Sequence, residues 1–584
     1  MAYVLATNIT SPLGTTTAEN YQAVKAGRTA LQRHDGLWGL PEPFCASLFT
    51  EAQKEALYID GLTRFESLVV RSVEEAMAQL PSFDIAAKNV IFILSTTKAN
   101  MELLEAPGET AQRIAHHLGL TTQPIAVCNA CISGVAAIIL AQRLTDGGHY
   151  DYAVVSGADV QSRFTVSGFQ SLKTVSADNC RPFDMERNGL NLGEAAATMI
   201  ICSHTRHPPA GGGAHGGLPE IGPGIIRNDA YHVSSPAKSG EGAWLALRDC
   251  LAATTTDILP TLAFINAHGT ATMFNDQMES VAIERAGLGD IPVNGLKGYY
   301  GHTLGAAGVL ETVISIAAIS DQTILATQGF EERGVSGKIC VTSESVFTAK
   351  TSFVKMISGF GGGNATVIVS VATTPTRHTS TTNPIKPTGP SSIKPINPAH
   401  RVIITPSSVT VDGQVLTASS HLADLYRHFV GDYPRFYKMD GLSRLGFIAS
   451  ELLLQAEEKV GEDTVPAHTP RTDRAVVLMG RSSSIATDKK YLETIAADNF
   501  FPSPSLFIYT LPNIVTGETA TRNLYHGETS FFLLPQRNEE AERAIAMATF
   551  QDSSIRSIIT GWIDYYGEAD YLADLAIVYH PEKR

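Results

Sequence analysis

The sequence lacks any long apolar run and any cluster of basic residues. The apolar run AAATMIIC at 195–202 has eight residues, one of them Thr, far below the roughly 20 residues that span a bilayer. The formal net charge is −14, and no run of Lys or Arg is available to bind nucleic-acid phosphates. We therefore expect no membrane insertion and no nucleic-acid partner.

Cysteine is sparse and unevenly placed. The seven cysteines stand at positions 45, 128, 131, 180, 202, 250 and 340, and residues 341–584 contain none. An odd, scattered set does not form a disulfide framework, and the first residues, MAYVLATNITSPLG, have neither the basic start nor the apolar core of a signal peptide. These features predict a reduced, cytoplasmic protein.

The 584 residues are long enough for several cores, since domains commonly hold roughly 100 to 200 residues. Residues 373–400 are rich in Pro, Thr and Ser and poor in apolar side chains, so burial cannot repay the entropy of ordering them. They are predicted to be a linker between residues 1–372 and residues 401–584.

Apolar β-rich runs alternate with helical stretches before this linker. A helical pattern follows in GVAAIILAQRLTDG, and such alternation predicts an α/β fold with parallel or mixed sheets between helical layers. The runs are NVIFILST at 89, DYAVVSGAD at 151, AATMIIC at 196, FINAHGT at 264 and ATVIVSV at 365.

The segment after the linker resembles the first half of the segment before it. GLTRFESLVVRSVEEAMAQL at 61 matches GLSRLGFIASELLLQAEEKV at 441, NVIFILSTTKANMELLE matches AVVLMGRSSSIATDKKYLE, and IAVCNACISGVAAIILAQRLTDG matches LFIYTLPNIVTGETATRNLYHG. Aligning Gly517 with Gly134 places Ile514 at the position of Cys131. The pattern predicts a truncated, non-catalytic copy at 401–584.

The motif VCNACISG at 127–134 contains Cys128 and Cys131. Their spacing is compatible with a metal knuckle, a redox pair, a disulfide or a single nucleophile. A zinc knuckle needs a second pair of ligands, and none follows at a suitable spacing. Since PIAVC is extended and a helical stretch follows, Cys131 is expected at a sharp strand-to-helix turn.

A helix N-terminus favours a thiolate, so this placement predicts a lowered pKa for Cys131 and backbone N–H groups that hold an oxyanion. The alternative interpretation is a small, inert core cysteine.

Two histidines and a glycine-rich segment follow later in the chain. INAHGTATMFND places His268 just after an apolar strand, and GLKGYYGHTLGAAGVLE places His302 before an Ala/Gly-rich helical stretch. ISGFGGGNATVIVS places Phe360 before three glycines. Each histidine alone is compatible with a core or loop residue, but both lie at the strand-to-loop edges where α/β active sites gather.

Together with SPLG and CRPFDMERNGLNLGEAAA at 180–197, these motifs resemble the β-ketoacyl-acyl carrier protein synthases, the elongating condensing enzymes of fatty acid and type II polyketide synthesis. The resemblance covers about residues 1–372. It implies a thiolase-like, five-layered α/β/α/β/α ketosynthase fold, with the C-terminal partial copy appended.

The resemblance also implies a role for each motif residue. Cys131 carries the acyl chain, and His268 and His302 stabilise the enolate formed when malonyl carrier protein loses carbon dioxide. Lys297, with Glu311 behind it, orients the histidines. Substrate contacts are expected from Phe360, Gly361, Thr270 and Thr272.

The expected partners are acyl- and malonyl-loaded acyl carrier protein and a second subunit, either a homodimer copy or a synthase-like partner such as a chain-length factor. No metal and no organic cofactor are expected, because decarboxylation generates the nucleophile. The alternatives are a decarboxylase or thioesterase-like relative that does not condense, and an inactive scaffold partner.

Overall fold

A computed structural model describes residues 2–203, 217–371, 397–417, 421–460, 468–496 and 499–581. Residues 373–396 of the predicted linker lie outside these ranges. The described chain repeats one five-stranded arrangement three times. We name these parts the first unit (residues 2–203), the second unit (217–371) and the third unit (397–581).

The first unit forms a mixed sheet in the order β5-β4-β6-β8-β1. β4 runs parallel to β5 and β6, and β8 runs antiparallel to β6 and β1. The predicted apolar runs at 89, 151 and 196 form three of these strands. Their bounds are β1 (Ala2–Thr10), β4 (Val90–Ser95), β5 (Ile125–Val127), β6 (Tyr152–Asp159) and β8 (Ala195–Ser203).

The second unit has the same order and the same directions, β11-β10-β15-β16-β9. Its last strand continues the first sheet, because β9 pairs with β1 through Tyr3 and Glu220. The strands are β9 (Pro219–Asn228), β10 (Leu262–Asn266), β11 (Pro292–Asn294), β15 (Ser352–Gly359) and β16 (Gly363–Val371).

The third unit repeats this order again, as β23-β20-β24-β25-β17. β20 runs parallel to β23 and β24, while β25 runs antiparallel to β24 and β17, as in the other two units. The strands are β17 (His400–Thr405), β20 (Arg474–Gly480), β23 (Thr529–Leu533), β24 (Ser557–Gly567) and β25 (Asp570–Tyr579).

Shorter strands and the helices complete the described chain. The short strands are β2 (Gln32–His34), β3 (Phe44–Ser47), β7 (Leu192–Gly193), β12 (Thr323–Ile324), β13 (Cys340–Val341), β14 (Val346–Phe347), β18 (Ser408–Val411), β19 (Gln414–Thr417), β21 (Ile495–Ala496) and β22 (Asn499–Phe500). The helices are α1 (Thr17–Lys25), α2 (Glu51–Leu57), α3 (Arg64–Met77), α4 (Pro107–His117), α5 (Ser133–Asp146), α6 (Arg163–Ser171), α7 (Glu241–Ala252), α8 (Met273–Arg285), α9 (Lys297–Tyr300), α10 (Ala307–Ser320), α11 (Leu422–Phe429), α12 (Gly441–Val460), α13 (Ile485–Glu493), α14 (Pro504–Tyr509), α15 (Ile514–Asn523) and α16 (Glu539–Thr549). In the ranges given above, no helix is both long enough and apolar enough to cross a bilayer.

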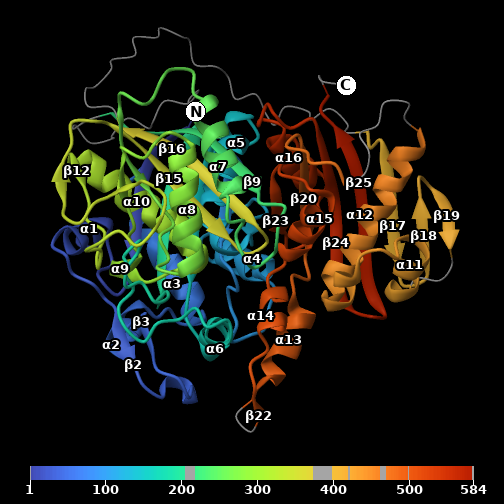
Figure 1. Ribbon diagram of the computed structural model, residues 1–584, viewed down its shortest axis with the longest axis horizontal. Helices are drawn as coiled ribbons and strands as arrows, with labels where there is room; N and C mark the ends of the chain where they lie inside the picture. Colours follow the sequence, from blue (N-terminus) through green and yellow to red (C-terminus); the bar gives the residue numbers. More distant parts are fainter. Residues whose placement is uncertain are drawn as a thin grey trace.

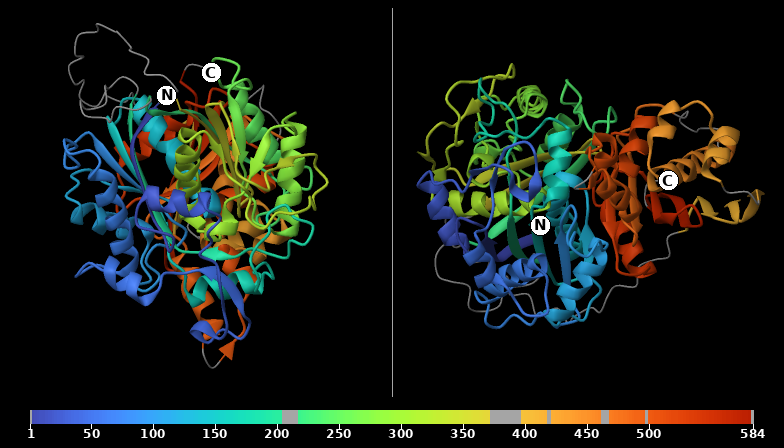
Figure 2. Two further views of the ribbon diagram at one scale, coloured as in Figure 1. Left: turned by 90° about the vertical axis from the view of Figure 1, so that its left-hand side faces the viewer. Right: turned by 90° about the horizontal axis from the view of Figure 1, so that it is seen from below.

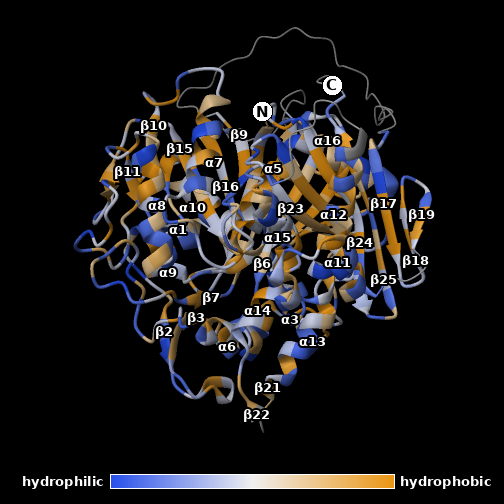
Figure 3. Ribbon diagram, turned by 45° about the vertical axis from the view of Figure 1, so that its right-hand side comes forward, coloured by the Kyte–Doolittle hydropathy of each residue, from blue (hydrophilic) through white to orange (hydrophobic). Residues whose placement is uncertain are grey.

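Helices and sheets alternate in five layers through the first two units (Figure 1). α3 covers the outer face of the first sheet, and α5 and α10 lie between the two sheets. α7 packs on the second sheet with α8 beside it, and both helices share an apolar cluster with its strands. The two central helices touch through glycine, since a Cβ on Gly134 would lie 2.7 Å from the Cα of Gly308. The layers match the expected α/β/α/β/α fold, and apolar residues concentrate in the strands (Figure 3).

The third unit joins the side of the first unit by continuing its sheet (Figure 2). β23 pairs antiparallel with β5, with Phe532 opposite Val127 and Leu533 opposite Ala126. α16 packs on α5, and one apolar cluster contains residues of both helices. Lys98 and Asp488 form a buried ion pair across the junction at 2.6 Å.

The strand order corrects one of the three expected segment matches. The matched segments at 61 and 441 form α3 and α12, and those at 89 and 475 form β4 and β20. However, the counterpart of the β5-to-α5 connection is the β23-to-α16 connection at 534–538, so the alignment of Ile514 with Cys131 is wrong. LFIYT belongs largely to helix α14 rather than to a strand, and residues 534–538, LPQRN, contain no cysteine.

Candidate active site

Cys131 lies in the tight turn that connects β5 to α5, as the sequence predicted. Ala130 has a left-handed backbone with φ of +50°, and residues 130–132 form one 3₁₀ turn before the helix begins. The Ser133 hydroxyl holds this turn, because it accepts from the Asn129 N–H (2.8 Å) and donates to the Ala130 carbonyl (2.6 Å). The turn presents the Cys131 side chain to a cavity.

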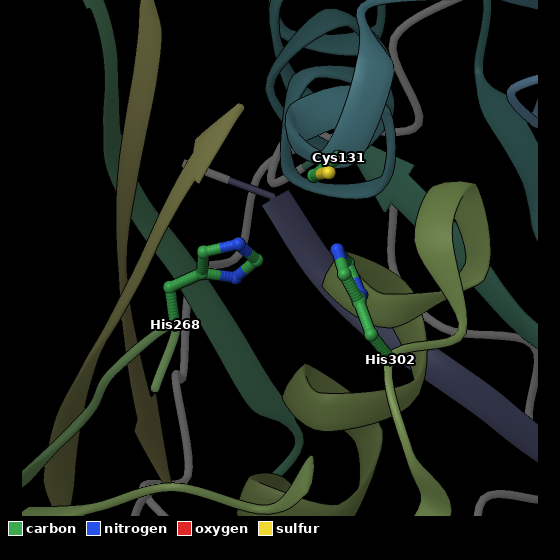
Figure 4. Close-up of side chains that lie close together, drawn as sticks. All are labelled: Cys131, His268 and His302. Atoms are coloured by element: carbon green, nitrogen blue, oxygen red, sulfur yellow. The ribbon is translucent and has the colours of Figure 1, made fainter. Parts of the chain in front are cut away.

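Cys131, His268 and His302 meet in that cavity (Figure 4). One ligand-type atom from each side chain lies within 4.8 Å of the other two. His268 follows β10 and His302 follows α9, so the second unit brings both imidazoles to the thiol of the first unit. The same three atoms could geometrically hold one metal ion, and the expected absence of a metal stays a prediction.

The imidazole rings are set at 80° to each other with centroids 5.0 Å apart. Nδ1 of His302 accepts a hydrogen bond from the backbone N–H of Leu304 (3.2 Å). The ring proton therefore resides on Nε2. That buried Nε2, like Nδ1 of His268, has no hydrogen-bond partner among the described residues, so both rings keep capacity for a substrate.

Burial lowers the pKa of His268 and His302 well below the usual value for histidine, and Lys297 and Lys355 lower both further. Both imidazoles are neutral at pH 7.

Cys131 is only 8% exposed, and burial raises the pKa of its thiol to about 12, although Lys297 acts in the opposite direction. The expected lowering of the Cys131 pKa is therefore wrong, because the loss of hydration outweighs the helix N-terminus.

A buried cluster of two lysines and one carboxylate lies behind the histidines. Lys297 Nζ donates to the His268 carbonyl (2.6 Å) and to Glu311 (2.7 Å), and Lys355 Nζ donates to the other oxygen of Glu311. Burial raises the pKa of Glu311, but the two lysines outweigh it and hold this carboxyl below its usual range. Burial lowers the pKa of Lys355 to about 8.

Sequence reasoning found Lys297 and Glu311 and missed Lys355. The available signal was a single lysine in the apolar run FVKMI, whose strand β15 is buried from Ser352 to Ser358.

The sequence analysis also missed Glu279 of α8. It accepts the backbone N–H groups of His268 (2.5 Å) and Gly269 (2.9 Å), and burial raises its pKa to about 7. These two hydrogen bonds hold the backbone of the loop that contains His268.

The expected substrate contacts divide into two groups. Thr270, Thr272 and Phe360 line the cavity of about 150 Å³ that contains Cys131 and the two histidines. Gly361 does not line it, although its neighbours Phe360 and Gly362 do. Instead, a Cβ on Gly361 would lie 2.5 Å from the side-chain amide of Asn513, a residue of the third unit that the sequence motifs did not point to.

Two family models match parts of the first and second units. Residues 89–207 match "Beta-ketoacyl synthase, N-terminal domain" and residues 221–331 match "Beta-ketoacyl synthase, C-terminal domain". Nodulation protein E of Rhizobium meliloti (strain 1021) is 30% identical over 325 residues, which cover 54% of this chain and 79% of that protein.

Two further relatives match over shorter lengths. Nodulation protein E of Rhizobium leguminosarum bv. trifolii is 31% identical over 265 residues, and 3-oxoacyl-[acyl-carrier-protein] synthase 2 of Rhizobium meliloti (strain 1021) is 34% identical over 259 residues. These alignments cover 44% and 42% of this chain. The chain spans 64% and 59% of the lengths of these two relatives.

The likeness to solved structures extends to all three units. "PfaC Keto synthase-Chain length factor" aligns with 99% of this chain and 78% of its own chain, at a TM-score of 0.75 and 14% sequence identity. This likeness concerns the fold and extends across the junction of β5 and β23.

Proposed function

Because the chain belongs to the β-ketoacyl synthase family, we propose that it is a β-ketoacyl-acyl carrier protein synthase. It condenses malonyl carrier protein with an acyl chain held on Cys131, in fatty acid, polyketide or aryl-polyene-type synthesis in the cytoplasm. The observation that carries this proposal is the meeting of Cys131, His268 and His302 in one buried cavity.

Acyl transfer starts from a neutral thiol. Since burial keeps the Cys131 thiol protonated, its proton must leave as the sulfur attacks the thioester carbonyl. His302 already carries its proton on Nε2, so His268 takes the thiol proton. The backbone N–H groups of Cys131 and Phe360 hold the oxyanion, and the carrier thiolate leaves with the proton from His268.

Condensation follows with both imidazoles neutral again. His302 Nε2–H and the ring N–H of His268 donate to the malonyl thioester oxygen as the carboxylate leaves as carbon dioxide. The resulting enolate carbon attacks the acyl carbonyl, and the Cys131 sulfur leaves as a thiolate, which takes up a proton from water to restore the thiol. Burial, together with the charges of Lys297 and Lys355, supports this step by keeping the imidazoles uncharged.

The carrier protein binds at the mouth of the cavity. His232, Val233 and Ser234 line both the active-site cavity and a neighbouring one, which also contains Arg435 and Lys438 of the third unit. These two basic side chains suit an acidic carrier protein. A double variant with Arg435→Glu and Lys438→Glu reverses both charges. It is expected to raise KM for malonyl carrier protein, but not for malonyl pantetheine.

The third unit is a non-catalytic, synthase-like domain that replaces a separate partner subunit. Its strand order supports this role, as does the match of the whole chain to a ketosynthase and chain-length factor structure. A chain cleaved at a protease site placed near residue 385 tests it. Full stability, assembly state and product length in the separated front portion would contradict this role.

The function itself is tested by mass spectrometry with malonyl carrier protein and a panel of acyl primers. A 3-ketoacyl product two carbons longer than the primer, and an acyl adduct on Cys131, are expected. Carbon dioxide release without this product would indicate a decarboxylase instead. Neither product nor carbon dioxide would indicate an inactive scaffold partner.

A further inference from the structure

Asn513 of the third unit uses its side chain in an unusual way. It is the residue before α15, where an Asn side chain normally caps the helix by accepting a backbone N–H. Here it makes no capping bond. Its side-chain amide instead donates to the carbonyl oxygen of Phe360 (2.8 Å), and the residue is only 5% exposed.

The glycine loop after Phe360 fits closely against α15. Gly361 has a left-handed backbone with φ of +90°. A Cβ on Gly517 of α15 would lie 2.5 Å from the Gly361 carbonyl oxygen and 2.8 Å from its Cα. Glycine is therefore required on both surfaces, and the loop has no room to move toward the helix.

The peptide between Phe360 and Gly361 is held at both ends. Its carbonyl oxygen accepts from Asn513, and its N–H donates to the carbonyl of Val233 (2.6 Å). The next carbonyl, that of Gly361, accepts from the side chain of Asn228 (2.8 Å). Because a peptide unit is planar, two opposed hydrogen bonds fix its orientation.

We propose that Asn513 is a positioning residue that fixes the Phe360–Gly361 peptide for acyl transfer, so that the third unit completes the active site of the first two. The inference rests on the proposed function. Phe360 lines the cavity beside Cys131. Its backbone N–H, one of the two oxyanion donors proposed for loading, belongs to the preceding peptide, which shares the Phe360 Cα with the fixed one. The histidines that serve decarboxylation do not depend on this peptide.

The test uses the full-length protein with two variants at one position. Asn513→Leu removes the donor at similar volume, and Asn513→Asp keeps the shape but turns an acceptor toward the Phe360 carbonyl. Thr519→Val is the matched control, because this buried hydroxyl on the same helix bonds, among the residues that the structure describes, only within the helix, to Val515 (3.0 Å). The rates measured are acylation of Cys131 by hexanoyl carrier protein and carbon dioxide release from malonyl carrier protein.

Both Asn513 variants are expected to slow acylation about tenfold, less than the loss of a whole oxyanion donor, while carbon dioxide release stays within about twofold of wild type. Thr519→Val is expected to change neither rate. Acylation at the wild-type rate in either variant would overturn the inference, as would a parallel fall of both rates. If wild-type Cys131 is not acylated at all, the proposed function fails instead.

Discussion

The first and third units share one strand order but differ at the connection that matters for chemistry. In the first unit, β5 leads through Ala130 and Cys131 into α5. In the third, β23 leads through Leu534–Asn538 into α16 without a cysteine. The first unit is also followed by a second unit that contributes His268 and His302, whereas the third has no such continuation among the described residues. In this structure the thiol and the two imidazoles come together because the first and second units face each other.

The largest expected effect comes from removing the thiol on the first-unit side. Cys131→Ala should lower condensation about 10³-fold or more, since no covalent intermediate can form, while some carbon dioxide release persists. Adding Gln536→Cys to this variant, at the corresponding connection, should restore nothing. Product analysis by mass spectrometry checks both, and restored condensation would break the comparison.

The junction between the two units should depend on its buried ion pair. Lys98→Ala leaves Asp488 unpaired in a buried place and should cost about 3–5 kcal/mol of unfolding free energy. The double variant with Lys98→Met and Asp488→Leu should recover most of the lost unfolding free energy. Urea denaturation measures both, with the exposed Lys173→Ala as control. An unchanged midpoint for Lys98→Ala would show that the units do not depend on this contact.

The contribution of the second unit is tested at His302. His302→Ala removes one donor to the enolate oxygen and should slow carbon dioxide release about 100-fold, on the order of 3 kcal/mol. Acylation of Cys131 should fall much less, because the other histidine takes the thiol proton. Equal losses in both steps would contradict this division of roles.

The smallest expected effect is a pH shift from Lys355→Met. Lys355 lowers the pKa of both histidines, together with burial and Lys297. Without its charge the imidazoles take up protons at higher pH, so the acid limb of the carbon dioxide release profile should move upward by about one pH unit. Lys350→Met, an exposed lysine just before the same strand, should leave the profile unchanged.

Most of the secondary structure of the first two units could be predicted from the sequence, because their strands and helices appear as continuous local patterns of apolar residues. The turn at Cys131 followed from an extended run that meets a helical one, whereas the two histidines were assigned to the site by the resemblance of their motifs to the β-ketoacyl synthases. The third unit was harder. LFIYT is a short apolar run that periodicity cannot assign to helix or strand, and it was matched to β5 although it folds largely as α14.

Residues that act through distant contacts escaped the sequence analysis. Asn513 precedes a helix, which predicts an ordinary cap, and only the packed chain shows that it reaches Phe360. The pKa of Cys131 was predicted in the wrong direction because a linear sequence shows the helix that follows a residue, but not the depth at which its thiol is buried.

The pairing of β5 with β23 also fixes how this molecule responds to dilution. The two paired edges belong to one polypeptide, so each is present at a high local concentration near the other, whatever the amount of protein in solution. The first and third units are therefore present in equal amounts at any expression level. Because β23 already occupies that edge of β5, a second chain cannot add a strand there.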